Sequence, residues 1–336
     1  IQILKSLIID SPLEYLKPFG GNFYFLRPIL QNINQLKREG VDVAKFENIA
    51  LNEQKNFDQI LDLYHDKGSH KGKMKGDYQK QQKNIYKNKE LSIIYSAYQA
   101  KLAENKLYDY SDMIMEVLIA LGNNKDLLLI LQEEHQYILV DEHQDTNNAQ
   151  NKILELLCNF HKSPNIFFVG DEKQAIFRFQ GASLENFLYF KNIYPKAKLI
   201  TLQENYRSTQ TILNAADSLL PSSKKLNANV IHDNRKIKIY EFSKPETELY
   251  FIAEDIAEKI KSGVDQDEIS VLYRDNRDAF PIARMLEKFG VPYVVRSDQD
   301  ILTDSDIKKF IVLLRAIHNF GVAEYLISAL HIDFLK

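Results

Sequence analysis

The chain has 336 residues, of which 45% are hydrophobic and 26% are charged, and its formal net charge is −3. This composition is ordinary for a soluble globular protein with room for two or three domains. Because the net charge is slightly negative, the chain is not basic overall, and any nucleic-acid-binding surface has to be local. The longest apolar runs fall well short of the ~20 residues of a membrane span. We expect no signal peptide, and we expect a cytoplasmic location. The only cysteine, Cys158, excludes an internal disulfide and is predicted to be a core residue.

The first hundred residues are predicted to be helical and polar. Apolar residues from Leu26 to Leu36 recur at helical spacing, and Gly40 is a plausible stop just beyond them. A second helix is predicted to begin near Tyr108 and to end at Leu121, before Gly122. Within it, Asp109 and Asp112 fit the start of a helix, where the macrodipole favours carboxylates.

The most basic stretch of the chain runs from Lys67 to Lys89 and holds eight lysines against one acid, Asp77. Two interpretations stay open. Lysines such as Lys71, Lys73 and Lys75 would contact DNA phosphates, or the glycine-containing stretch is a solvated loop. The sequence Gly68 to Met74 superficially resembles a phosphate-binding loop, but it lacks the required spacing and the Ser or Thr after the lysine.

Three short apolar runs are predicted to be buried strands, and each ends in a polar motif. Residues 137–140 lead into Asp141 and Glu142, residues 165–169 lead into Gly170 and Asp171, and residues 198–202 lead into the run 203–208. In open α/β folds, ligands bind at the edge of the sheet where the carboxyl ends of parallel strands meet. The pattern therefore predicts one ligand site built from all three motifs.

The remaining chain alternates between predicted helices and strands. After a helix over residues 208–220 and a linker that begins at Pro221, the pattern is strand, helix, strand, helix, strand, over residues 236–242, 246–261, 268–273, 277–288 and 291–296. Such βαβαβ alternation predicts a second parallel sheet.

The three polar motifs together carry a resemblance to a known family. The first is Asp141-Glu-His-Gln-Asp-Thr-Asn147, the second runs from Val169 through Gln174 to Ala182, and the third is Glu204-Asn-Tyr-Arg-Ser208. In this order and spacing they resemble the superfamily 1 DNA helicases of the UvrD/Rep/PcrA type. The resemblance implies an α/β fold of RecA-like, P-loop NTPase motor domains with parallel sheets and a helical inserted subdomain. It places the subdomain at residues 1–107, the rest of the first motor domain at 108–225 and the start of the second at 235–336.

The resemblance also implies an activity, which is hydrolysis of ATP with Mg²⁺ to drive 3′-to-5′ movement along single-stranded DNA, with partly duplex DNA as a substrate. Asp141 is the candidate Mg²⁺ ligand, through water, and Glu142 is the candidate for activating the attacking water. Gln174 would sense the γ-phosphate, and Asp171 would support the metal site.

Two further residues of the third motif complete the predicted nucleotide site. Arg207 is the candidate arginine finger, a role worth about 10³–10⁵ in rate, and Tyr206 would stack on the adenine. On the DNA side, Phe177 and Phe179 would stack against bases without sequence preference, although a core position is the simpler interpretation for Phe177.

Some positions depart from the family's helicase branch. Lys173 and Phe179 look more like the RecB/AddA branch of recombination nucleases, Gln180 replaces an arginine, and His143 replaces a usual Phe. A RecB/AddA-like subunit is therefore one alternative. A non-catalytic DNA-binding remnant is another, because the chain has no phosphate-loop Gly-Lys-Ser or Gly-Lys-Thr. We expect the chain to be a piece of a longer protein whose missing N- and C-terminal parts would act as its partners, and to be inactive alone.

Overall fold

The computed structural model describes most of the chain, namely residues 1–67, 70–160, 163–175, 190, 192–220, 225–230, 232–233, 235–296, 302 and 305–332. The chain forms two compact units. The first comprises Ile1–Gln203 and Ser218–Lys225, and the second comprises Glu204–Asp217 and Leu226–Lys336.

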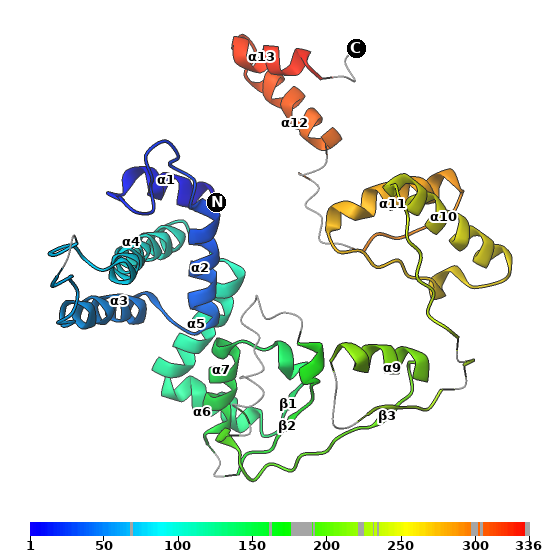
Figure 1. The fold of residues 1–336 in the computed structure, drawn as a ribbon, viewed down its shortest axis with the longest axis horizontal. Helices are drawn as coiled ribbons and strands as arrows, with labels where there is room; N and C mark the ends of the chain where they lie inside the picture. Colours follow the sequence, from blue (N-terminus) through cyan, green and yellow to red (C-terminus); the bar gives the residue numbers. More distant parts are fainter. Residues whose placement is uncertain are drawn as a thin grey trace. The chain divides into compact units, whose positions relative to one another are not determined.

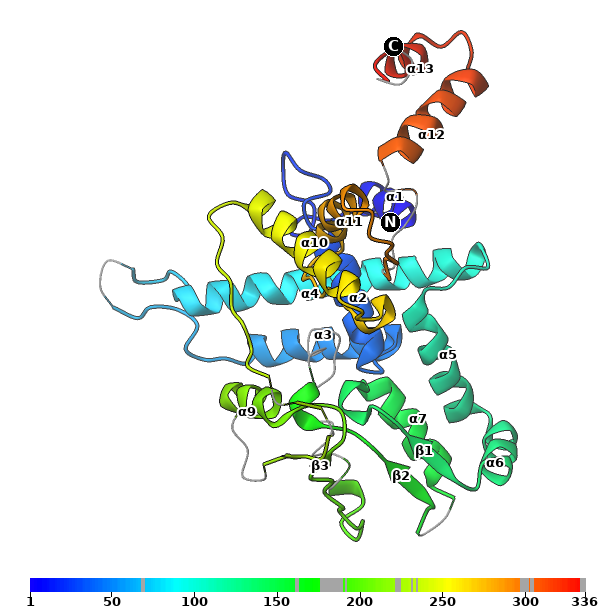
Figure 2. The same ribbon diagram turned by 90° about the vertical axis from the view of Figure 1, so that its right-hand side faces the viewer.

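Six helices open the first unit (Figures 1 and 2). They are α1 (Gln2–Asp10), α2 (Leu26–Arg38), α3 (Val43–Asp58), α4 (Gly76–Glu104), α5 (Tyr110–Asn123) and α6 (Lys125–Glu134). The predicted helix around Leu26–Leu36 is confirmed, and Gly40 follows its end with a φ of 65°, a left-handed conformation that glycine adopts without steric cost. Helix α5 continues through Gly122 to Asn123, so the predicted stop at Gly122 is wrong. One glycine in the last turn does not end α5, because its backbone can still take part in the helical hydrogen bonding.

A continuous apolar core joins helices α1, α2, α3 and α4. Leu4 and Ile8 of α1, Ile33 of α2, and Ile94 and Tyr95 of α4 are buried in one cluster. The spacing of Leu4 and Ile8 is the i, i+4 repeat that places residues on one helix face. This burial is the main favourable term in holding the helices together.

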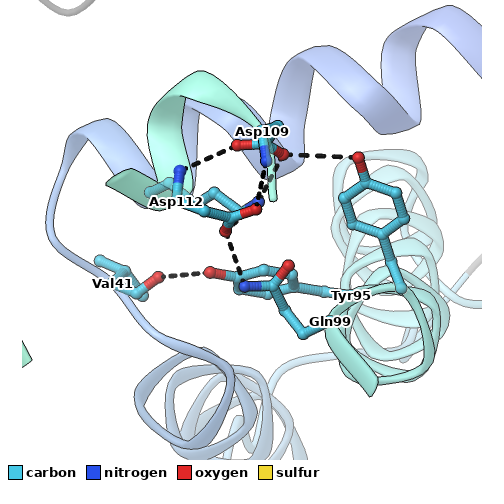
Figure 3. Close-up of polar contacts among 7 residues, drawn as sticks. Val41, Tyr95, Gln99, Asp109 and Asp112 are labelled. Carbon is cyan, nitrogen blue, oxygen red and sulfur yellow. Dashed lines mark hydrogen bonds and ion pairs between the residues drawn. The ribbon is translucent and has the colours of Figure 1, made fainter. Parts of the chain in front are cut away.

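A buried ion-pair network lies where α2, α4 and α5 meet (Figure 3). Lys37 is 1% exposed, and its Nζ lies 2.6 Å from Asp109 Oδ2 and 2.6 Å from Asp112 Oδ1. Asp109 caps the N-terminus of α5, and Asp109 and Asp112 form a reciprocal capping box. The prediction that these carboxylates start a helix is therefore confirmed, and Lys37 gives them a second role.

The network also changes the acidity of its members. Burial alone would raise the pKa of Asp112, but hydrogen bonds from the Asp109 backbone N–H, from Lys37 and from Gln99 outweigh burial and lower it. Burial and the two nearby carboxylates raise the pKa of Tyr98 to about 12. Asp112 is therefore charged and Tyr98 is neutral at pH 7.

Two parallel strands follow the helices. Strand β1 (Ile138–Val140) pairs with β2 (Ile166–Phe168), with Ile138 opposite Ile166 and Val140 opposite Phe168. Helix α7 (Asn148–Cys158) connects them and lies beside the pair in both views (Figures 1 and 2). Cys158 is buried at the end of α7, as predicted.

The third predicted strand of this sheet, over residues 198–202, is wrong. These residues form no strand, and Leu199, Ile200 and Leu202 are exposed. A two-residue strand, β3 (Glu204–Asn205), begins just after them and pairs in parallel with β4 (Asn227–Ala228) in the second unit. An apolar run predicts a strand, but whether it pairs depends on a distant partner.

The second unit contains the predicted helices without the predicted sheet. Its helices are α9 (Gln210–Leu219), α10 (Pro245–Lys261), α11 (Ala279–Lys288), α12 (Ser305–His318) and α13 (Ala323–Leu330). Residues 236–242, 268–273 and 291–296 form no strand, so the second parallel sheet is a wrong prediction for this structure. Ile269, Val271 and Val291 instead pack their side chains on α10 and α11 without a backbone ladder.

Within the described residues, no helix combines the length and the apolar character that crossing a membrane requires.

Candidate nucleotide-hydrolysis site

The carboxyl ends of β1 and β2 lie side by side, and the first two polar motifs begin there. The ladder continues past the strands, because Val169 N–H donates to Val140 O at 2.8 Å and His143 N–H donates to Val169 O at 3.0 Å. The predicted convergence of the first two motifs at one sheet edge is confirmed.

Glu142 stands at this edge in a conformation that few residues adopt. Its φ is 48° and its ψ is 39°, which is the left-handed region, and among the described non-glycine residues only Lys106 also has a positive φ. Such a backbone costs on the order of 1–3 kcal/mol and persists where surrounding contacts hold it. Asp141 Oδ1 accepts the Glu142 N–H at 2.9 Å, and both carboxylates remain exposed. The turn therefore presents two adjacent carboxylates to an incoming ligand.

Gln144 connects the two motifs, which the sequence reasoning missed. Its side-chain N–H donates to Glu142 Oε2 at 2.6 Å, and its Oε1 accepts the backbone N–H of Asp171 at 3.0 Å. Gln144 is itself buried. A primary amide both donates and accepts, so it is suited to bridge an acidic side chain and a backbone N–H. The sequence feature that could have indicated this role is the position of Gln144, two residues after the acidic pair.

Gly170 makes this bridge sterically possible. A Cβ on Gly170 would lie 2.7 Å from Gln144 Oε1 and 3.3 Å from the backbone nitrogens of Gln144 and His143. The glycine is therefore required for close approach of the two loops.

Asp171 carries the link onward to Gln174. The Gln174 side-chain N–H donates to Asp171 Oδ2 at 2.9 Å, and the Lys173 backbone N–H donates to Asp171 Oδ1 at 3.0 Å. Three of the predicted site residues, Glu142, Asp171 and Gln174, thus belong to one hydrogen-bonded chain that passes through Gln144.

His143 points into the protein and away from this chain of carboxylates. Its ring packs against Phe168 at a centroid distance of 4.5 Å, in an edge-to-face geometry. Burial lowers the pKa of His143, and a hydrogen bond with Asn151 partly opposes that shift. The neutral ring serves as a packing element behind the turn, at a position where the family usually has an aromatic residue.

Tyr206 and Arg207 lie on a turn in the second unit. The Asn205 side-chain oxygen accepts the backbone N–H groups of Arg207 and Ser208 at 3.0 and 2.7 Å, which shapes the turn. Both Tyr206 and Arg207 are exposed, and the turn presents them on consecutive residues. The structure therefore groups Asp141, Glu142, Asp171 and Gln174 in one unit and Tyr206 with Arg207 in the other.

The described part of the basic stretch forms a hairpin and a helix. Lys73 and Lys75 lie in a turn that is bonded back to His65 and Leu63, and from Gly76 onward the chain is helix α4. The solvated-loop interpretation is therefore wrong for the lysines beyond Gly76. Lys71 and Lys73 are exposed, whereas Lys75 pairs with Asp62 at 2.5 Å, a contact that raises the pKa of Lys75. Phe177 and Phe179 lie outside the described residues.

The donor set at the β1–β2 edge suits one kind of metal. Among the described residues, no group of three or more His, Cys, Asp or Glu side chains is arranged to hold an ion. Mg²⁺ does not need such a cage, since it is held by one or two carboxylates together with phosphate oxygens and waters. Exposed Asp141 and Glu142, followed by the Asp171–Gln174 pair, fit that requirement.

Parallel strands that deliver an acidic pair and a Gly-Asp-x-x-Gln motif to one edge have the arrangement of a P-loop NTPase motor domain. Family models agree with this class. Residues 22–195 match the UvrD/REP helicase N-terminal domain, and residues 200–323 match the UvrD-like helicase C-terminal domain. The chain belongs to the UvrD/Rep helicase family, which confirms the resemblance found in the motifs and implies a RecA-like α/β fold.

Curated relatives extend the match. The chain is 31% identical over 289 residues to the ATP-dependent DNA helicase PcrA of Staphylococcus aureus, and 32% identical over 289 residues to that of Staphylococcus epidermidis. Both alignments cover 84% of this chain and 38% of the relative. The chain therefore spans about two fifths of the length of these relatives.

Proposed function

We propose that the protein is an ATP-dependent DNA helicase or translocase that couples Mg-ATP hydrolysis to 3′-to-5′ movement along single-stranded DNA. Single-stranded and partly duplex DNA are its partners, and it works in the cytoplasm. The membership in the UvrD/Rep family supports this activity class, and the relatives' printed activity supports ATP as the fuel.

One observation carries the proposal most directly, and it is the bridge that Gln144 makes between Glu142 and Asp171. A motor has to report the state of the nucleotide from the hydrolysing residues to the rest of the chain. The bridge ties the proposed water-activating Glu142 to the loop that carries Gln174. A shift of either motif is transmitted to the other through two hydrogen bonds.

The proposed roles follow from chemistry and exposure. Asp141 would hold Mg²⁺ through water, with Asp171 supporting it, and Glu142 would take a proton from the attacking water. The metal, when bound, would neutralise charge on the phosphate oxygens. Gln174 would contact the γ-phosphate with the part of its amide that Asp171 does not occupy.

Arg207 and Tyr206 are the proposed nucleotide contacts of the third motif. Arg207 has a permanent planar charge suited to a transferring phosphoryl group, and the exposed Tyr206 ring is free to stack on an adenine. For DNA, Lys71, Lys73 and Lys75 would meet phosphates and Phe177 and Phe179 would stack on bases. Lys75 would contribute least, because Asp62 already pairs with it.

The domain plan remains the one expected from the motifs. Residues 1–107 would form the inserted helical subdomain, residues 108–225 the rest of the first motor domain, and residues 235–336 the beginning of the second. The dense helical core that includes Leu4 and Ile94 supports the first assignment.

The test is DNA-stimulated ATP turnover by the protein, compared with that of its Glu142→Gln variant. Removing a general base costs about 10²–10⁴ in rate, so kcat should fall at least a hundredfold while ATP binding persists. Glu116→Gln, at an exposed site on α5, is the matched control and should leave kcat unchanged. Turnover that survives Glu142→Gln would remove the assigned base, and DNA binding without any turnover would favour a non-catalytic role.

A further inference from the structure

The loop between α1 and α2 presents aromatic rings to solvent. Phe19 is 110% exposed, Tyr24 is 74% exposed and Phe23 is 40% exposed. In both ribbon views this loop, drawn in blue, stands out from the neighbouring helices (Figures 1 and 2). Neighbouring exposed rings of this size mark an interaction surface more often than scattered single ones do.

The loop has a defined conformation because α4 holds it. The Glu90 carboxylate accepts the backbone N–H groups of Glu14, Tyr15 and Leu16 at 2.7 to 3.0 Å. Hydrogen bonds to a charged acceptor are stronger than neutral ones. Leu16 is also buried in the helical core. The stem of the loop is therefore fixed, and its rings are presented from a preorganised base.

A tight turn places Phe19 at the tip. Gly21 N–H donates to Pro18 O at 3.2 Å, and Gly20 has a φ of 86°. A positive φ at the third position is the signature of a type II turn, which glycine supplies at no steric cost. Phe19 occupies the second position, where its side chain projects outward.

Two lysines lie over rings of this loop. Lys5 Nζ lies 5.6 Å from the Phe23 ring centroid, and Lys87 Nζ lies 4.7 Å from that of Phe25. Tyr24 packs edge-to-face on Phe25, with the two ring centroids 4.8 Å apart. Glu90, the acidic group of α4 at this point, is occupied by the loop backbone. The loop thus combines exposed rings with two lysines that lie over Phe23 and Phe25.

We propose that this aromatic–basic surface, defined as Phe19, Phe23, Tyr24, Lys5 and Lys87, binds single-stranded nucleic acid. Unpaired bases have faces on which rings stack, each ammonium is near enough to meet the adjoining phosphates, and neither contact depends on sequence. A duplex hides its base faces, so it gains only the phosphate contacts. The inference rests on the proposed DNA binding and adds a site separate from the lysines at 71–75.

The first test measures the affinity of the 336-residue chain for a fluorescent oligo-dT and for a blunt duplex of equal length. Phe19→Ala with Tyr24→Ala should weaken oligo-dT binding by about fivefold or more and leave duplex binding within about twofold, because only the stacking partners are removed. Phe19→Tyr with Tyr24→Phe keeps both rings and should retain full affinity. Tyr110→Ala removes an exposed ring on α5 and is the matched control.

A second test reads the contact directly. The chain has no tryptophan, so Phe19→Trp introduces a single indole reporter. Oligo-dT should quench its emission, whereas Tyr110→Trp should stay unchanged. Unquenched emission together with full affinity of the alanine variant would overturn this site and leave the proposed function standing. No oligo-dT binding by the unaltered chain would count against both.

Discussion

The helical region of the first unit, which comprises helices α1 to α5, and the second unit bury their apolar residues to very different extents. In the helical region, Leu4, Ile33 and Ile94 are completely buried. In the second unit, Ile239, Leu272 and Val294 lie in predicted strands and are exposed, Leu272 by 94%. Both regions are rich in apolar residues, so composition does not separate them.

The difference lies in where the hydrogen-bond partners come from. A helix satisfies its own backbone within four residues, so an apolar face is enough to fix how it packs. A strand needs a neighbour that is distant in sequence, and both faces stay open until another layer covers them. Even the paired strand β1 shows this, because Leu139 is 79% exposed while Ile138 and Val140 are partly covered.

The largest effect is expected from Lys37→Met in the helical region. Removing one partner of a buried ion pair leaves the other charges without compensation and costs about 3–5 kcal/mol. Amide hydrogen exchange in α2, α4 and α5 would report the loss locally. Lys101→Met, which breaks an exposed pair with Glu104, should cost less than about 1 kcal/mol. Equal protection in wild type and Lys37→Met would contradict the role given to this network.

A paired truncation tests the comparison itself. Ile94→Ala should destabilise the helical region by about 2–5 kcal/mol, since it opens a cavity in a closed core. Leu272→Ala should change stability by no more than about 0.5 kcal/mol, because its side chain already contacts water. Chemical unfolding followed by circular dichroism would measure both. A large loss from Leu272→Ala would mean that its segment is covered in solution.

The same distinction explains how far the sequence predicts the structure. Helical spacing located α2, and the alternation of predicted strands and helices located α10, each to within a few residues. Polar residues after apolar runs located the acidic pair and the Gly-Asp motif. The strands at residues 236–242 and 291–296 were wrong, because the pattern reports burial tendency and not the presence of a partner. Lys37 was not anticipated at all, since a lysine on a helix is usually solvated.

Within the candidate site, the sequence predicted which loops meet but not how they are joined. Asp141 and Asp171 follow neighbouring strands, as their positions after apolar runs indicate. The bridging role of Gln144 depends on the close approach that Gly170 permits, and that approach is a property of two loops 26 residues apart. The assignment of Arg207 rests on its motif, and its role remains a prediction.

Gly170→Ala and Gly122→Ala should act in opposite directions. The added methyl at Gly170 would overlap Gln144 Oε1, and relief of that overlap should cost about 1–3 kcal/mol and misplace Glu142. At Gly122, nothing lies within 4 Å of the added methyl and the residue is helical, so alanine should stabilise α5 by up to about 1 kcal/mol. Thermal unfolding of the two variants would compare them, and a neutral Gly170→Ala would show that the loops have room to separate.

The smallest expected effect is the loss of stability at acidic pH that protonation of Asp112 causes. The pKa of Asp112 is lower in the folded chain than its usual 3.8, so the unfolded chain binds this proton more readily. The stabilisation is therefore complete above pH 3.8 and is lost as the pH falls through the lower, folded value. Amide exchange in α5, followed as the pH falls from about 6 to about 3, should show protection that declines more steeply in wild type than in Asp112→Asn. The exposed control Asp126→Asn should keep the wild-type slope, because Asp126 stands in the first turn of α6 outside the network. If Asp112→Asn also keeps it, Lys37 and Asp109 hold the helices together without Asp112.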